Sequence, residues 1–347
     1  MLNNSHASDQ SGNSVELDVN LEALQESAVS VFHEQCTSIQ KLSEGGFHKV
    51  YILKMKNDKE YIGRVAFPVY PRWKTESEVA VMEYIRLNTT IPIPKVYYWN
   101  SSVNNPVRAE YIFMERLSSS RLCDIWPGLS INKKEMFLLK IIEILLALKK
   151  LTFSKVIEID LFSDERATLS TMEKGPFNTT KEYILAVIRN KIRYYETFKS
   201  IDQQEYWIPR YQELCKLVPK YFQDDENKFV LTHGDFHSSN ILVNNDEITG
   251  IIDWECSGAF PMECLCTYPV WITDNPMMEP TNEEFKENLT LQKFFRDNII
   301  HRDPDFKRII DNINEKKDEF YSAVFNQEEW KINDSLDELG INNMFTF

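Results

Sequence analysis

The sequence predicts an α+β protein with two lobes: a small lobe of five β-strands and one helix, and a larger, mainly helical lobe. Three observations support this fold class. Apolar residues alternate with a period near two between Cys36 and Phe67, strand signals largely end after Glu115, and long helical patterns follow. With 347 residues, 43% of them hydrophobic, the chain is long enough for two lobes that share a cleft.

The first 35 residues are predicted to form a flexible N-terminal tail, because the opening stretch is rich in Ser, Asn and Asp. The small lobe is predicted at residues 36–116. One helix, residues 75–87, follows the third strand; Thr75 can cap it, and the segment Ile91-Pro-Ile-Pro94 ends it. The five predicted strands are residues 39–42, 49–54, 61–67, 96–99 and 110–114.

The larger lobe is predicted at residues 117–347 and is mostly helical. One short β-hairpin interrupts it, with apolar strands at residues 241–243 and 248–252 and the turn sequence Asn244-Asn245-Asp246 between them. Residues after Asn282 return to charged, helix-like sequence. The main predicted helices are residues 133–151, 181–198 and 204–222.

Composition disfavours several classes of partner. The chain has 39 Lys and Arg against 53 Asp and Glu, a net charge of −14, so it repels nucleic-acid phosphates and anionic lipid, and we expect no nucleic-acid partner. No run of about eighteen uncharged apolar residues is present, so we expect no membrane insertion. The six cysteines lack zinc-site spacing, and the N-terminus lacks the pattern of a signal peptide or presequence, which favours a cytoplasmic location.

The strongest chemical signal is the segment His233-Gly-Asp-Phe-His-Ser-Ser-Asn240, followed by Ile251-Ile-Asp-Trp-Glu255. Asp235 and Asn240 are five residues apart on a tight loop, and the hairpin returns Asp253 to the same place. Carboxylate and amide oxygens suit the octahedral, oxygen-only preference of Mg²⁺. A carboxylate beside an attacking hydroxyl or amine, with a metal on nucleotide phosphates, is the requirement of phosphoryl transfer.

This pattern, H-G-D-x4-N followed by I-I-D-W, resembles the catalytic and metal-binding segments of the aminoglycoside phosphotransferase family, whose fold is similar to that of protein kinases. The resemblance implies that Asp235 is the catalytic base or orients the nucleophile. It implies that His233 braces the catalytic loop, and that Asn240 and Asp253 hold Mg²⁺. Taken alone, the two aspartates could instead be a turn residue and a helix cap.

The resemblance extends to the small lobe. Gly45 and Gly46 lie between two predicted strands, as a kinase phosphate loop does, although an isolated glycine pair is also typical of a hairpin turn. The third strand matches the kinase strand whose lysine contacts the α- and β-phosphates; Arg64 stands in that position, with Glu78 as its implied ion-pair partner. Arginine stays charged and can pair bidentately with phosphate.

Residues 114–117 resemble the linker between kinase lobes, where backbone groups contact adenine. The resemblance therefore implies nucleotide contacts at Glu115 and Leu117, with Val50, Ile62 and Met114 as candidate walls of the adenine pocket. Each of these apolar side chains could equally be ordinary strand core.

The amino-acid sequences of several segments are similar to those of a fungal branch of the family, in which arginine also replaces the lysine. Some members of that branch are associated with mitochondrial inheritance, which leaves a mitochondrial location as the alternative. The resemblance covers about residues 36 to 275. The segments are Ser77-Glu-Val-Ala-Val-Met-Glu83, Ile91-Pro-Ile-Pro-Lys95, Asn105-Pro-Val-Arg-Ala-Glu-Tyr-Ile-Phe-Met-Glu115 and Cys264-Leu-Cys-Thr-Tyr-Pro269.

The resemblance implies an ATP- and Mg²⁺-dependent phosphotransferase that transfers the γ-phosphoryl group to a hydroxyl or amine of a small-molecule acceptor. Residues 36–116 would bind the nucleotide, and residues 117–347 would supply the catalytic groups and the acceptor site. A protein kinase is an alternative, disfavoured because no A-P-E-like element follows Asp253. A catalytically weak binding or scaffold protein is another, left open by Arg64. The acceptor and the oligomeric state are not indicated.

Three further residues lie near these motifs, and the sequence indicates a role for two of them. Trp254 is expected in the core, where it would hold Asp253 in place. His237 is expected to be a structural or solvent-facing loop residue rather than a catalyst, and the role of His48, inside the expected phosphate loop, is left open.

Overall fold

The computed structural model describes residues 19–68, 71–156, 172–222, 228–273, 282–307, 315–326 and 329–345. The chain forms two compact units. The first runs to Ala147 and also includes His233–Ser257 and Tyr268–Lys293; the second contains Leu148–Thr232, Gly258–Thr267 and Phe294–Phe347. All candidate site residues lie in the first unit. The division into a nucleotide-binding lobe and a catalytic lobe stays a prediction.

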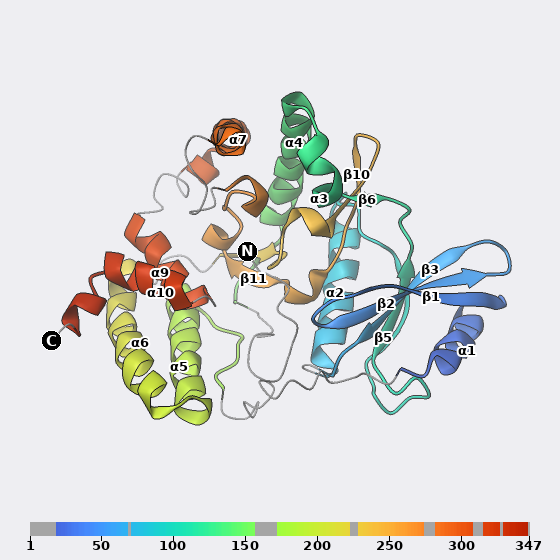
Figure 1. Cartoon of the computed structure of the whole chain (residues 1–347), viewed down its shortest axis with the longest axis horizontal. Helices are drawn as coiled ribbons and strands as arrows, with labels where there is room; N and C mark the ends of the chain where they lie inside the picture. Colours follow the sequence, from blue (N-terminus) through green and yellow to red (C-terminus); the bar gives the residue numbers. More distant parts are fainter. Residues whose placement is uncertain are drawn as a thin grey trace. The chain divides into compact units, whose positions relative to one another are not determined.

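The first unit contains the predicted five-stranded antiparallel sheet, in the order β1-β2-β3-β5-β4 (Figure 1). The predicted helix follows the third strand as α2, Trp73–Asn88. The α+β prediction is therefore confirmed. The strands are β1 (Cys36–Glu44), β2 (His48–Met55), β3 (Glu60–Ala66), β4 (Val96–Asn100) and β5 (Tyr111–Glu115).

A helix absent from the prediction, α1 (Leu21–Phe32), covers one face of this sheet. Part of the expected flexible tail is thus wrongly assigned, because Leu24 and Ala28 are fully buried against strand residues such as Leu53 and Phe113. Asn20 caps the helix by accepting a hydrogen bond from the Ala23 amide at 3.2 Å. Residues 1–18 of the expected tail lie outside the described residues.

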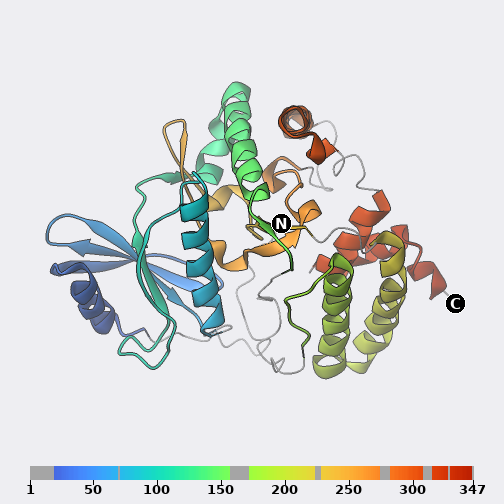
Figure 2. The same cartoon turned by 180° about the vertical axis from the view of Figure 1, so that it is seen from behind.

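Helix α2 lies on the opposite face of the sheet from α1 (Figure 2). Successive side chains of a strand point to opposite faces, so neighbours in β3 have different surroundings. Val65 packs in the core beneath α1, whereas Arg64 contacts Glu78 of α2. The position of the candidate nucleotide residue therefore follows from strand register.

The predicted hairpin is present in the first unit as β9 (Ile241–Asn244) and β10 (Glu247–Ile251). It forms a three-stranded sheet with β6 (Ser120–Arg121), in the order β10-β9-β6. The hairpin brings its two ends together, because the Ile252 amide donates to the Asn240 carbonyl at 3.0 Å. Helix α3 (Leu122–Ile125) follows β6.

The second unit contains two long predicted helices side by side, α5 (Thr180–Phe198) and α6 (Ile201–Tyr221) (Figure 2). Aromatic residues, including Tyr183, Trp207 and Tyr211, fill its core. A small sheet in the order β11-β8-β7 was not predicted; its strands are β7 (Thr152–Phe153), β8 (Phe229–Thr232) and β11 (Gly258–Pro261).

The remaining helices are α4 (Ile131–Lys149), α7 (Glu283–Arg302), α9 (Glu315–Phe325) and α10 (Glu329–Glu338). The short 3₁₀ turns are η1 (Trp126–Gly128), η2 (Ser238–Asn240), η3 (Trp254–Cys256), η4 (Met262–Cys264), η5 (Val270–Ile272) and η6 (Asn342–Met344). Among the described residues, no helix combines the length and apolar character that a membrane span requires.

Candidate functional site

The loop that carries Asp235 passes closely against the segment after Asp253. Gly234 has a φ of +78°, and a Cβ there would lie 1.9 Å from the Cys256 carbonyl oxygen. Any other residue would force the two segments apart. The glycine of the H-G-D motif is thus required by the close approach of two backbones.

His233 joins the same two segments through its side chain. Its Nε2–H donates to the Ile252 carbonyl at 2.9 Å, and its Nδ1 accepts from the Asp235 amide at 3.3 Å. Its ring lies 4.4 Å from that of Trp254, which is fully buried as expected. Burial lowers the pKa of His233, which keeps the ring neutral. This geometry agrees with a bracing role.

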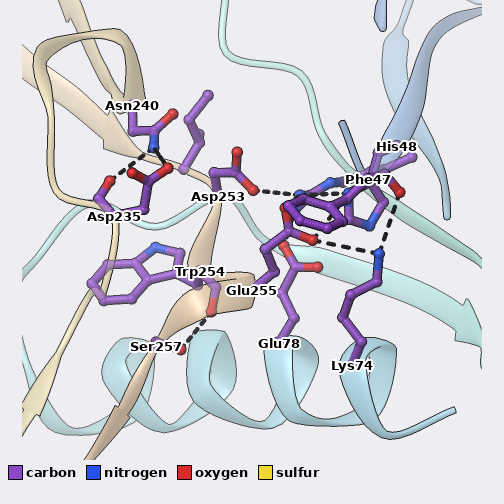
Figure 3. A network of polar contacts seen from close by, with 12 residues as sticks. Phe47, His48, Lys74, Glu78, Asp235, Asn240, Asp253, Trp254, Glu255 and Ser257 are labelled. Atoms are coloured by element: carbon purple, nitrogen blue, oxygen red, sulfur yellow. Dashed lines mark hydrogen bonds and ion pairs between the residues drawn. The ribbon is translucent and has the colours of Figure 1, made fainter. Parts of the chain in front are cut away.

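Asp235 and Asn240 lie in direct contact. The Asn240 Nδ2 donates to the Asp235 backbone carbonyl at 2.9 Å and to its Oδ2 at 3.2 Å. The amide oxygen of Asn240 points away from Asp235 (Figure 3). It accepts no hydrogen bond from the described residues, so it is available to a ligand.

Arg64 is the centre of a buried charged cluster. Its guanidinium donates to Glu78 Oε1, to Asp253 Oδ1 and, at 2.9 Å, to His48 Nδ1. The ion pair between Arg64 and Glu78 that the resemblance implied is therefore present. Burial alone would lower the pKa of Arg64, but Asp253 and Glu255 outweigh burial and raise it.

Two charged members of this cluster were not predicted. Lys74 precedes Glu78 by one helical turn of α2; its Nζ donates to the Phe47 carbonyl at 3.2 Å and lies 3.5 Å from Glu255 Oε2 (Figure 3). Glu255 Oε2 also lies 3.2 Å from His48 Nδ1. The available sequence signals were their spacing: Lys74 shares a helix face with Glu78, and Glu255 is two residues after Asp253.

Burial controls the titration of these groups. It raises the pKa of Glu255 to about 7. It lowers the pKa of His48 well below its usual range, assisted by Arg64 and Lys74. The neutral His48 ring can then accept the hydrogen bond from Arg64. His48, whose role was left open, therefore anchors the start of β2 to the cluster.

The cluster contains two cations, Arg64 and Lys74, and three carboxylates, Glu78, Asp253 and Glu255. Glu78 and Glu255 have side chains only 1% and 6% exposed, whereas that of Asp253 is 35% exposed. Buried charges require partners. Asp253 is thus the carboxylate most open to an added cation.

The residues fit Mg²⁺. Asp253 and Asn240 supply only oxygen donors, one anionic and one neutral, as Mg²⁺ prefers. Arg64 outweighs the effect of burial and lowers the pKa of Asp253, so its carboxyl group is ionised. Within the described ranges, no group of three or more His, Cys, Asp or Glu side chains could hold a metal alone. A two-residue site therefore needs ligand oxygens, such as phosphates, to complete it.

The structure gives less support to the two glycines. Gly45 and Gly46 form the exposed turn between β1 and β2. A hydrogen bond closes this turn, in which the Gly45 amide donates to the His48 carbonyl at 3.0 Å. A Cβ at either position would meet nothing within 4 Å. No contact in the structure requires glycine there, so the flap role stays a prediction.

The expected adenine contacts lie around the third and fifth strands. Val50 pairs with Arg64 in the sheet register. Glu115 uses its carboxylate to accept from the Lys95 amide at 3.1 Å, and Leu117 packs against Gly250. Their contacts with a nucleotide stay predictions.

The model of the phosphotransferase enzyme family matches residues 38–264. The chain belongs to the phosphotransferase enzyme family.

Solved structures similar to this family member include aminoglycoside phosphotransferases. The crystal structure of APH(4)-Ia aligns with a TM-score of 0.53 and 15% identity over 93% of this chain and 97% of that one. The streptomycin–ATP–APH(2")-IIa ternary complex aligns with a TM-score of 0.54 and 16% identity over 94% and 96%. At such identity the likeness shows the fold, which is kinase-like.

Curated relatives of this phosphotransferase family member include fungal proteins. A subtelomeric hrmA-associated cluster protein of Aspergillus fumigatus is 38% identical over 112 residues, which is 32% of this chain and 22% of the relative. Altered inheritance of mitochondria protein 9, mitochondrial, of Yarrowia lipolytica is 31% identical over 86 residues, 23% of this chain and 15% of the relative. The matches thus span about a fifth of the relatives' length.

Proposed function

We propose that this protein is an ATP- and Mg²⁺-dependent phosphotransferase that transfers the γ-phosphoryl group to a hydroxyl or amine of a small molecule. The observation that carries the proposal is the convergence of Asp235, Asn240 and Asp253 at the two ends of one hairpin, with Arg64 bound to Asp253. Family membership supports it.

Each residue has a defined role in the proposed reaction. Asp235 accepts a hydrogen bond from the acceptor group and aligns it for in-line attack, with His233 bracing the loop. Arg64, held by Glu78, binds phosphate oxygens. Asn240 and Asp253 would hold Mg²⁺, which neutralises phosphate charge when bound.

The small-molecule class of the acceptor is part of the same proposal. Solved relatives of similar fold are complexes with streptomycin or with hygromycin B, which supports a small-molecule acceptor here without naming it. For location we keep the cytoplasm as the proposal, with mitochondria as the alternative that the names of the yeast relatives favour. Fractionation of cells that express the tagged full-length protein decides between them.

One contact favours a second candidate, a catalytically weak binding or scaffold protein. The Arg64 guanidinium occupies Asp253 Oδ1, the carboxylate proposed for Mg²⁺. If this contact persisted when ATP was present, Asp253 would offer Mg²⁺ only its other oxygen, and Arg64 would be less available to phosphate. The phosphotransferase proposal expects Arg64 to turn from Asp253 to phosphate.

Formation of ADP by the purified protein separates the two candidates. With ATP and Mg²⁺, even without an acceptor, we expect slow transfer to water that stops on chelation of the metal and in Asp235→Ala. ATP binding without ADP formation would favour the scaffold protein.

A further inference from the structure

His237, which is expected to be a structural or solvent-facing loop residue rather than a catalyst, contacts the proposed catalytic carboxylate. Its Nε2 lies 3.2 Å from Asp235 Oδ2, and Ser239 Oγ forms a hydrogen bond with its Nδ1. Three polar side chains at every second position of one loop thus form a continuous chain from Ser239 to Asp235.

The chemistry of the three groups fixes the direction of both hydrogen bonds. With Asp235 ionised, its Oδ2 can only accept, so the Nε2 of His237 donates to this oxygen at 3.2 Å rather than accepting from the more distant Asn240 Nδ2 at 3.4 Å. In a neutral imidazole Nδ1 is then an acceptor, and the Ser239 hydroxyl donates to it. Ser239 therefore stabilises the tautomer that can donate to Asp235.

The same contacts distinguish the two oxygens of Asp235. Oδ2 accepts from His237 Nε2 and from Asn240 Nδ2, both at 3.2 Å. Oδ1 accepts from no other described residue. Two donors on one oxygen limit rotation of the carboxylate and leave the other oxygen free.

We propose that His237 is a positioning residue for phosphoryl transfer: it holds Asp235 Oδ2 so that Oδ1 faces the acceptor, and Ser239 holds the imidazole. The inference rests on the proposed function of Asp235. A small displacement of an aligned group costs up to about 100-fold in rate, so such a hydrogen bond affects turnover. The side chain of His237 is 31% exposed, so its replacement leaves the core intact.

The loop offers variants that differ in one group each. His237→Gln places an amide N–H near the position of Nε2, His237→Asn places it near Nδ1, and His237→Leu removes both ring nitrogens. Ser239→Ala removes the hydroxyl that holds the ring. Ser238→Ala is the matched control, because the Ser238 hydroxyl makes no hydrogen bond with the part of the chain that the structure describes.

Steady-state ADP formation from ATP and Mg²⁺ gives the first readout. We expect His237→Leu and His237→Asn to lower kcat about 30-fold with KM for ATP within about two-fold, while His237→Gln retains most of kcat. Ser239→Ala should lower kcat about five-fold alone and add nothing to His237→Leu, because both act through one hydrogen bond. Equal losses in the Gln and Leu variants, or a parallel rise in KM, would overturn the proposal.

Nitrogen-15 NMR of the His237 imidazole gives a readout that needs no turnover. In alkaline buffer we expect a proton on Nε2 and none on Nδ1, and a mixture of tautomers in Ser239→Ala but not in Ser238→Ala. A proton on Nδ1, or equal tautomers in the unmodified protein, would contradict the inference. If the protein bound no ATP, the proposed function would fail, and the NMR result would still show whether Ser239 holds His237 in the tautomer that donates to Asp235.

Discussion

The cluster around Arg64 and the loop around Asp235 hold their charged groups in opposite ways. Arg64, Glu78 and Glu255 have side chains 9%, 1% and 6% exposed, locked between a sheet, a helix and a turn. Asp235 and His237 are 20% and 31% exposed and are held by hydrogen bonds within one loop. The groups proposed for the nucleotide are thus part of the packing, whereas the group proposed for the acceptor is supported locally.

This difference implies a division of effects. Changes in the buried cluster should reduce both stability and nucleotide binding, because they leave unpaired charges in the core. Changes in the loop should reduce turnover and leave stability and nucleotide affinity nearly unchanged.

Loss of Glu78 should have the largest effect on stability. Glu78→Ala leaves the buried guanidinium of Arg64 without its deepest partner, so the free energy of unfolding should fall by about 3 to 5 kcal/mol. Chemical denaturation measures it. Glu83→Ala is the matched control on the same helix, since Glu83 pairs with Arg86 at the surface and its loss should cost less than about 1 kcal/mol. Similar losses in both variants would show that the Arg64 pair is not structural.

Replacement of Asp235 should separate turnover from binding. Asp235→Asn keeps the volume but removes the charge that attracts the acceptor proton, so kcat for ADP formation should fall about 100-fold or more. The dissociation constant for ATP, measured by calorimetry, should change less than about two-fold. An equal loss of nucleotide affinity would place Asp235 in the nucleotide site instead.

Lys74→Met should destabilise the protein by about 2 to 3 kcal/mol, because Glu255 loses one of its cations in a buried site. When Glu255 is already replaced by Gln, Lys74→Met should lower the free energy of unfolding by clearly less, since no Glu255 carboxylate is left unpaired. Lys133→Met provides the control: its pair with Asp246 is exposed. Equal costs in both backgrounds would mean that Lys74 and Glu255 are not coupled.

A smaller effect should appear in the pH dependence of stability. The folded state raises the pKa of Glu255 from 4.5 to about 7, so between these values it binds more protons than the unfolded chain. Stability from this group therefore falls as pH rises through this range, by on the order of 1 kcal/mol or more. The amide of Glu255→Gln does not titrate, so this variant lacks the pH dependence that Glu255 contributes.

The melting temperature of the unmodified protein, minus that of Glu255→Gln, should therefore decrease between about pH 5 and pH 7. The comparison with this variant is needed because His48, whose pKa is lowered, contributes in the opposite direction below its usual pKa. A difference that does not change with pH would show that Glu255 is ionised throughout.

Local patterns explain which elements could be predicted. The five strands, α2 and the hairpin each have a clear apolar period or turn sequence, and the H-G-D segment has motif spacing. Helix α1 was missed because two of its three buried residues are alanines, which give a weak apolar signal. The strands β7, β8 and β11 have only two to four residues, too few to show a period.

The missed site residues depend on tertiary structure. A single lysine in a polar helix and a glutamate after a tryptophan are usually solvated, and only the packing of α2 against the turn after Asp253 buries Lys74 with Glu255. The contact of His237 with Asp235 depends on the geometry of the loop. Neither the alternation of apolar and polar residues nor the amino-acid composition determines that geometry.

Calorimetric titration with ATP, with and without Mg²⁺, tests the central claim most directly when the unmodified protein is compared with Asp253→Ala. We predict Mg²⁺-enhanced binding that loses its dependence on Mg²⁺ in the variant. ATP binding that is identical with and without Mg²⁺, or unchanged by Asp253→Ala, would contradict the assignment of Asp253 as the residue that joins metal to nucleotide.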